Sequence, residues 1–389
     1  MRRLILIAAA LMLALLPAAV FAADAREEPD DSIEDELIRQ ISELDLSGWE
    51  EYFIDLGRLT GRDFASLDGL LLSYAELGSS EAPDGLWETV GLLLRSELKR
   101  SAGAAALLAA AAMMTALSGV IADEGIRPVL GFILCGTAVT LTAGVFAALG
   151  KTASEAVAAA GELTERTLPI MSALLVSLGA VSSAGIFRPL MLFLSGTVIF
   201  IVQGLILPAV LMGGVLSVID ALTEGGRMSE LVKLVQKLVK WALGLVSTFY
   251  FGMSAVQGLT VASRDGVTVR TAKYALSGLV PIVGNMIGGT VDTVMGCALL
   301  IKNGVGAAAI LILLSILIRP LAVLAAGIFI FRTAAALSQP AADPKVVRLL
   351  SGAADMTNGL FACVAVTGAM LALTFLVFIA SGGISAGLW

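Results

Sequence analysis

Long apolar runs separated by short polar segments follow one another along most of the chain. The runs cover residues 102–122, 128–150, 168–187, 189–219, 241–263, 274–301, 305–331 and 359–381. At about 20 residues per membrane-crossing helix, they predict an all-α, polytopic membrane protein with seven or eight spans. Prolines within 168–219 and 274–331 leave a choice open: each region holds two full helices or contains re-entrant half-helices bent at proline.

The N-terminal quarter of the chain has a different pattern. Met1-Arg2-Arg3, an apolar stretch and the small-residue site ending at Ala22 are typical of a secretory signal peptide cleaved after Ala22. From Asp24 to Arg100 the chain carries 20 acids and only 7 Lys or Arg, with short amphipathic stretches punctuated by glycine. We therefore expect a signal peptide at 1–22, a small acidic, extracytoplasmic helical domain at 23–100 and a transmembrane domain at 101–389. The acidity is explained by solubility alone or by a docking surface.

One amphipathic segment precedes the run 241–263. Its apolar face comprises Met228, Leu231, Val232, Leu234, Val235, Leu238 and Val239. Its other face carries Lys233, Lys237 and Lys240, and Trp241 follows directly. Because lysines favour anionic headgroups and Trp favours the membrane interface, the pattern predicts an interfacial helix lying on the membrane surface.

Two parts of the membrane region resemble each other in sequence. Pro169 and Pro208 recur 112 residues later as Pro281 and Pro320, and the segments 231–235 and 244–246 recur 115 residues later as 346–350 and 359–361. Two copies of a unit with proline-broken helices are typical of many membrane channels and carriers. The alternative is chance, because sequences built from Ala, Gly, Leu and Val align easily with one another.

The composition narrows the function classes. The chain is 58% hydrophobic with a mean hydropathy of +0.92, and it contains no histidine. This excludes His-based acid–base chemistry and the commonest metal ligand. Cys135, Cys297 and Cys363 are far apart in apolar runs, and there is no nucleotide-binding loop. We therefore expect no enzyme activity, cofactor, metal or nucleic-acid partner, and the energy for any transport comes from a gradient or another subunit.

Polar residues are concentrated between 257 and 306, and these are the candidate pore, gating or structural residues. They are Gln257, Asp265, Gly266, Arg270, Lys273, Pro281, Asn285, Asp292, Lys302 and Asn303, with Arg319 in the next run. Charges at bilayer depth are costly and often functional. Asp292 and Arg319 are therefore interpreted as a buried pair or pore lining, or as residues at helix ends or bends that water reaches.

The same region contains a polar connector. Asp265-Gly266 indicates a turn, and Arg270 and Lys273 follow just ahead of the apolar run that begins at Tyr274. Nothing in this pattern alone distinguishes it from an ordinary charged loop.

The identities of the residues in this region are more informative than their pattern. The shared elements are Val256-Gln257-Gly258, Asp265-Gly266-Val267-Thr268, Arg270-Thr271-Ala272-Lys273, Pro281, Gly284, Asp292-Thr293 and Lys302-Asn303. Together they resemble the signature region of the stage III sporulation protein AE family. Ser182-Ser183-Ala184 ahead of Phe187 and Pro189, the signal peptide and the overall length extend the resemblance over nearly the whole chain.

The resemblance implies a membrane subunit of the complex that links mother cell and forespore during sporulation. Its implied partners are other membrane proteins of the same operon, a secretion-type ATPase and ring-forming subunits, in a homo- or hetero-oligomer. Its implied place is the mother-cell membrane around the forespore, where the subunit forms a channel or export gate needed for late forespore development. The alternatives are a secondary transporter that uses Asp292, and a membrane scaffold for complex assembly.

Overall fold

The computed structural model describes residues 127–178, 181–223, 228–279, 283–339 and 344–381, and before them residues 95, 96, 99 and 110. Between 257 and 297 it describes the backbone, apart from 280–282. The expected signal peptide, nearly all of the acidic domain and nearly all of the run 102–122 lie outside the described residues.

Every element in the described part of the chain is helical, which confirms the all-α class. The elements are α6 (Arg127–Ser177), α7 (Val181–Ile201), the π-helical turn η1 (Val202–Ile206), α8 (Leu207–Leu222), α9 (Ser229–Leu279), α10 (Val283–Ser338) and α11 (Pro344–Ala380). Over these residues, five helices are long and apolar enough to cross a membrane. The protein is a membrane protein, while the count of seven or eight spans stays a prediction.

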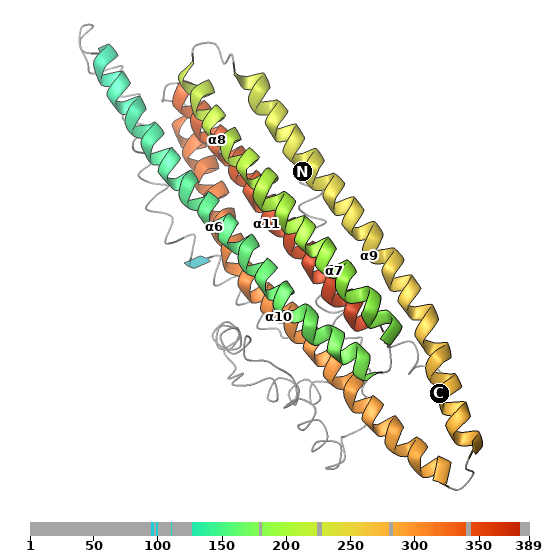
Figure 1. Ribbon diagram of the computed structural model, residues 1–389. Helices are drawn as coiled ribbons and strands as arrows, with labels where there is room; N and C mark the ends of the chain where they lie inside the picture. The colour runs from blue at the N-terminus through green and yellow to red at the C-terminus, as the bar shows by residue number, and fades with distance from the viewer. Residues whose placement is uncertain are drawn as a thin grey trace.

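The helices form an up-and-down bundle in which successive long helices alternate in direction (Figure 1). Helices α7, η1 and α8 join end to end as one of these long rods. Helix α11 lies at the centre, against α10, α6, α8 and α9. In its most apolar stretch 83% of the residues are buried, against 17% for α6. The core of the bundle is therefore built around α11.

Glycines set how closely these helices approach. Gly213 packs against Met356, Gly327 against Leu149 and Gly306 against Ile379, so near that a methyl group at any of the three would overlap its neighbour. Small residues at helix crossings allow close backbone approach in membrane proteins, where packing drives association. The crossings of α10 and α11 with their neighbours depend on these positions.

The turn η1 has a geometric reason. In an unbroken α-helix, the buried positions of α7 (191, 194, 195, 198) and of α8 (207, 210, 213, 214, 217, 221) would be centred roughly 110° apart. The π turn inserts one residue, shown by the hydrogen bond from Leu207 N–H to Val202 O, and so aligns both sets with the core. Pro208, which has no N–H to donate, follows directly.

Three helix boundaries differ from those the sequence predicted. Helix α6 continues through 151–167, which separate two apolar runs, and residues 229–240 form the first turns of α9 instead of a separate interfacial helix. Helix α9 also continues through Asp265 and Gly266, since one glycine costs a helix only about 1 kcal/mol. Helix α9 ends at Leu279 and α10 begins at Val283, so 274–301 does not form one continuous helix.

Candidate functional site

Most of the predicted site residues lie along the hairpin of α9 and α10. Helix α9 carries Gln257, Asp265, Gly266, Arg270 and Lys273, and the first turns of α10 carry Asn285 and Asp292. Pro281 lies outside the described residues. The backbone thus brings the diagnostic residues to the two arms of one hairpin, near the end where α9 gives way to α10 (Figure 1).

Asp292 and Arg319 are far apart. Both lie on α10, separated by 27 residues of continuous helix, which corresponds to about 40 Å. The two side chains therefore do not pair within one chain. Arg319 is exposed on the outside of the bundle.

Lys302 is a residue of α10 that contacts the C-terminal end of α11, and its side chain is completely buried. Its ammonium group donates one hydrogen bond to Ile379 O at 2.9 Å and another to Ser381 O. It also lies 5.8 Å from the centre of the Phe378 ring. Within the part of the chain that the structure describes, no carboxylate pairs with it. The negative end of the α11 helix dipole and the Phe378 ring stabilise the ammonium charge instead.

Asn303 is the neighbour of Lys302 and keeps part of its polar side chain inside the bundle. Its Oδ1 atom is buried and accepts no hydrogen bond from any described residue. Of the predicted site residues whose side chains are described, Lys302 and Asn303 therefore form the buried polar end of the bundle, and Arg319 stands apart from them.

A charged surface on α6 forms a second candidate site, which the sequence analysis missed. Five exposed residues, here called the α6 polar stripe, occupy one side of the helix: Lys151, Glu155, Glu162, Glu165 and Arg166. Lys151 pairs with Glu155 at 3.7 Å, and Arg166 pairs with Glu162 at 2.5 Å. The stripe spans 16 residues, or about 24 Å of helix.

The stripe lies beside apolar outer surfaces. Gly161 packs against Ile199 of α7, and the next residue of α7, Phe200, is 77% exposed. Gly150 packs against Leu211, and Gly213, two residues further along α8, packs against Val235 of α9. Together these contacts place Val235 level with residue 148 of α6. Because α6 and α9 run in the same direction, Phe249, which is 14 residues after Val235 and 55% exposed, lies level with Glu162.

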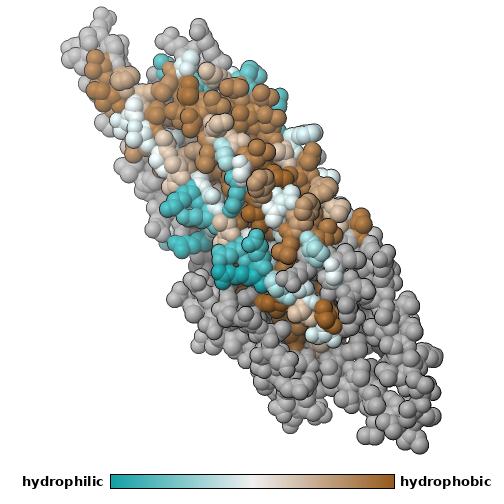
Figure 2. Space-filling model, viewed as in Figure 1, coloured by the Kyte–Doolittle hydropathy of each residue, from teal (hydrophilic) through white to brown (hydrophobic). Residues whose placement is uncertain are grey.

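Hydrophilic side chains therefore interrupt a surface that is otherwise hydrophobic at the same level. Figure 2 shows such side chains gathered midway along one face of the molecule, with hydrophobic regions beyond them. Arg319 is exposed at the same level of the bundle. Because Gly327 of α10 packs against Leu149 and the two helices are antiparallel, Arg319, eight residues away, lies between the levels of Glu155 and Glu162.

The sequence contained a signal for this stripe. Lys151 and Glu155, and likewise Glu162 and Arg166, are four residues apart, the spacing of ion pairs on one helix face. The segment was instead interpreted as a gap between spans. Chemically, the stripe offers fixed charges of both signs, and no group of three or more metal-ligating side chains occurs among the described residues.

Comparisons with known proteins support the family resemblance that the motif region carries. The chain is 31% identical over 233 residues to the stage III sporulation protein AE of Bacillus subtilis (strain 168), which covers 60% of this chain and 58% of that protein. No solved structure matches the chain. Residues 80–382 match the family described as Stage III sporulation protein AE, so the resemblance is confirmed and the chain belongs to that family.

Proposed function

We propose that the protein is a non-enzymatic channel or export-gate subunit of a sporulation complex that links mother cell and forespore. In this proposal it resides in the mother-cell membrane around the forespore, with its N-terminal segment on the extracytoplasmic side. It assembles with further copies or with other membrane subunits, a secretion-type ATPase and ring-forming proteins. Family membership supports the role in sporulation.

The observation that carries the channel role is the level of the α6 polar stripe. A bilayer placed over the exposed Phe200 and Phe249 also covers Glu162 and Glu165. A charge at the centre of a membrane helix costs about 2.5 to 3.5 kcal/mol on insertion scales. Such residues face water-filled cavities or other protein segments rather than lipid. We therefore assign the stripe and Arg319 to the lining of an aqueous path between subunits.

Cysteine accessibility tests this assignment. In a chain whose three native cysteines are replaced by alanine, Glu162→Cys and Glu165→Cys are compared with Phe200→Cys and Phe249→Cys. The probe is a charged, membrane-impermeant thiol reagent, applied to membranes that contain the assembled complex. Because the thiolate reacts only where water reaches it, we expect the first pair to react at least about tenfold faster.

The controls lie on exposed positions at matching levels, so they separate water from lipid. Equal, fast labelling of all four cysteines would place the whole level outside the bilayer. Protection of both glutamate positions would show that the stripe is covered, and either result contradicts the aqueous path.

A transport assay distinguishes the alternative functions. Liposomes containing the chain and its partner subunits are expected to leak small solutes down their gradients, and Glu162→Leu is expected to reduce the leak. Accumulation of a solute against its gradient by the chain alone would indicate a secondary transporter. No permeability at all with an assembled complex would indicate a scaffold.

A further inference from the structure

A groove runs along the outside of the bundle between α9 and α11, with α8 as its third wall. It encloses about 100 Å³ and extends from Gln236 to Ser247 on α9 and from Asp355 to Val366 on α11. Eleven residues of helix correspond to about 16 Å, close to half of the ~30 Å hydrocarbon core of a bilayer. The groove is thus long enough to hold part of one acyl chain.

Glycine keeps the middle of the groove open. A side chain on Gly244 would meet no atom within 4 Å, so the space beside it is free. On the opposite wall, Gly359 lets Val210 approach closely, with 3.3 Å between a Cβ placed there and Val210 Cγ1. The lining in this part is almost entirely apolar.

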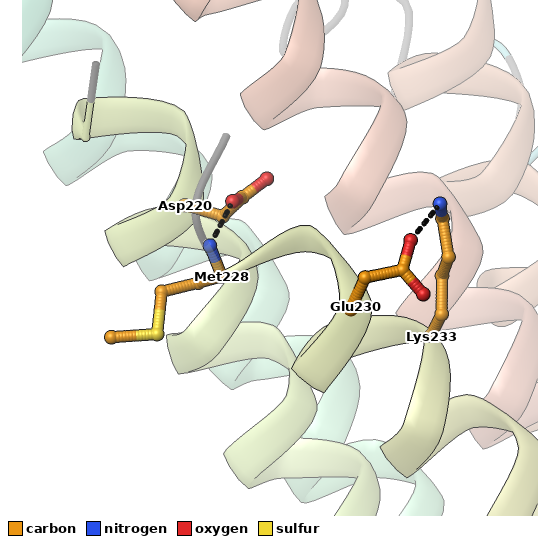
Figure 3. A network of polar contacts seen from close by, with 4 residues as sticks. All are labelled: Asp220, Met228, Glu230 and Lys233. Atoms are coloured by element: carbon orange, nitrogen blue, oxygen red, sulfur yellow. Dashed lines mark hydrogen bonds and ion pairs between the residues drawn. The ribbon is translucent and has the colours of Figure 1, made fainter. Parts of the chain in front are cut away.

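Lysines stand at one end of the groove. Lys240 lines it, and Lys237 is exposed one turn earlier on the same side of α9. Neither lysine forms an ion pair with any residue that the structure describes. Lys233, one turn further, differs because its ammonium group binds Glu230 Oε1 at 2.7 Å (Figure 3). Asp355 also lines the groove, but its Oδ1 accepts a hydrogen bond from Arg332 at 2.6 Å.

The side of α9 next to the lysines is suited to lipid tails. Leu234, Leu238, Trp241, Leu245 and Phe249 form an exposed row, in which Trp241 is 72% exposed. Trp favours the level of the headgroups, so the lysines lie at the interface and the groove descends from them into the hydrocarbon.

We propose that this groove binds one anionic phospholipid. Lys237 and Lys240 hold the phosphate, and one acyl chain lies in the groove past Gly244. Charge complementarity and the apolar continuation of the groove beyond the lysines identify the occupant as a lipid. The site is independent of the α6 polar stripe and of the channel role.

The test uses the purified full-length chain in a neutral detergent. Native mass spectrometry measures how many phosphatidylglycerol or phosphatidylcholine molecules stay bound, and thermal unfolding measures the shift in Tm that each lipid causes. We expect one tightly held phosphatidylglycerol and a larger rise in Tm with this lipid than with phosphatidylcholine. The double variant Lys237→Gln/Lys240→Gln is expected to bind phosphatidylglycerol about tenfold more weakly, to the level of phosphatidylcholine.

Matched variants separate the headgroup from the chain. Gly244→Leu, whose Cβ would meet no atom within 4 Å, fills the groove and is expected to abolish tight binding of either lipid. Gly244→Val serves if the larger side chain impairs folding. The controls are Lys233→Gln, whose charge is already paired, and Gly252→Leu, which is also free of neighbours but outside the groove. Both controls are expected to bind like the unchanged protein.

Three results would overturn the proposal. These are equal retention of the two lipids by the unchanged protein, undiminished phosphatidylglycerol binding in Gly244→Leu, and an equal rise in Tm with glycerol phosphate, which has no acyl chain. Each is independent of whether the complex conducts solutes.

Discussion

At the scale of single residues, Lys302 shows how a cation is kept inside an apolar bundle without a carboxylate among the described residues. Two carbonyl oxygens at the end of α11 accept its hydrogen bonds, and the Phe378 ring lies beside it. Carbonyls at a helix C-terminus have no partner within their own helix. One side chain thus satisfies two backbone groups of another helix and fixes where α10 and α11 meet.

Replacing Lys302 by methionine keeps most of the volume and removes the hydrogen bonds. The two carbonyls then lose their donor in the interior, so we expect the free energy of unfolding to fall by about 1 to 3 kcal/mol. Thermal unfolding in detergent, followed by circular dichroism, measures the change. Lys151→Met is the control, because Lys151 is 78% exposed. If both variants unfold at the same temperature as the unchanged protein, Lys302 does not hold α11 in place.

The sequence identified Lys302 and Asn303 as unusual but not what Lys302 contacts. Its acceptors lie 77 and 79 residues later in the chain, and they are backbone atoms, which carry no residue-specific signal. The pairing of Arg332 with Asp355 across two helices was equally hidden. Polar contacts between helices depend on register, and the sequence pattern does not determine register.

At the scale of helices, the contact of α10 with α11 depends on Gly306. A Cβ there would overlap the buried Ile379 side chain. Overpacking a tight core costs about 1 to 3 kcal/mol, so we expect Gly306→Ala to lower the stability by this amount. Gly196→Ala is the matched control: its Cβ would meet nothing within 4 Å, and alanine favours helix by up to about 1 kcal/mol.

The two variants can be compared by their Tm in the same detergent. Gly306→Ala should melt below the unchanged protein and Gly196→Ala at or above its Tm. An unchanged Tm for Gly306→Ala would mean that α10 and α11 separate at little cost.

The apolar runs predicted which segments are helical but not where the helices end. The apolar runs leave 151–167 as a gap between spans, yet its ion-pair spacing and its alanines favour helix. Residues 228–240 are amphipathic whether they lie flat on a membrane or form the outer turns of a bundle helix. Hydrophobic periodicity gives the faces of a helix and leaves its direction open.

The internal repeat stays a prediction. Helices α9 and α11 begin 115 residues apart, at Ser229 and Pro344. This is the offset at which the segment 231–235 recurs as 346–350. The prolines that recur at an offset of 112 differ in their place along the helices: Pro169 and Pro320 lie inside helices, and Pro281 lies between two.

At the scale of the whole molecule, the central place of α11 predicts where the bundle opens last. Its most apolar stretch is 83% buried, whereas that of α9 is 33% buried. Amides in the core exchange through the largest opening motions, and outer elements open locally. Hydrogen exchange in detergent should therefore be slowest for peptides covering 360–378, and faster for those covering 231–256. The reverse order would contradict the arrangement in Figure 1.

The bundle is also much longer than a bilayer is thick. Helix α6 has 51 residues and α10 has 56, or about 76 and 84 Å, against a hydrocarbon core of about 30 Å. Hydropathy counts apolar residues but does not show how many share one rod. For this reason the number of runs in the sequence exceeds the number of rods over the same residues.

The π turn between α7 and α8 has an evolutionary consequence. Because it compensates for one additional residue, the chain length between Met191 and Ala221 is coupled to the rotational phase of everything beyond it. A homologue that lost one residue from 202–206 would keep a regular helix, but the half beyond the deletion would turn by about 100° relative to the rest. Its glycines 213 and 214 would then leave Met356 and Phe146. Length changes are therefore expected to be selected against in this turn more strongly than in the connectors between helices.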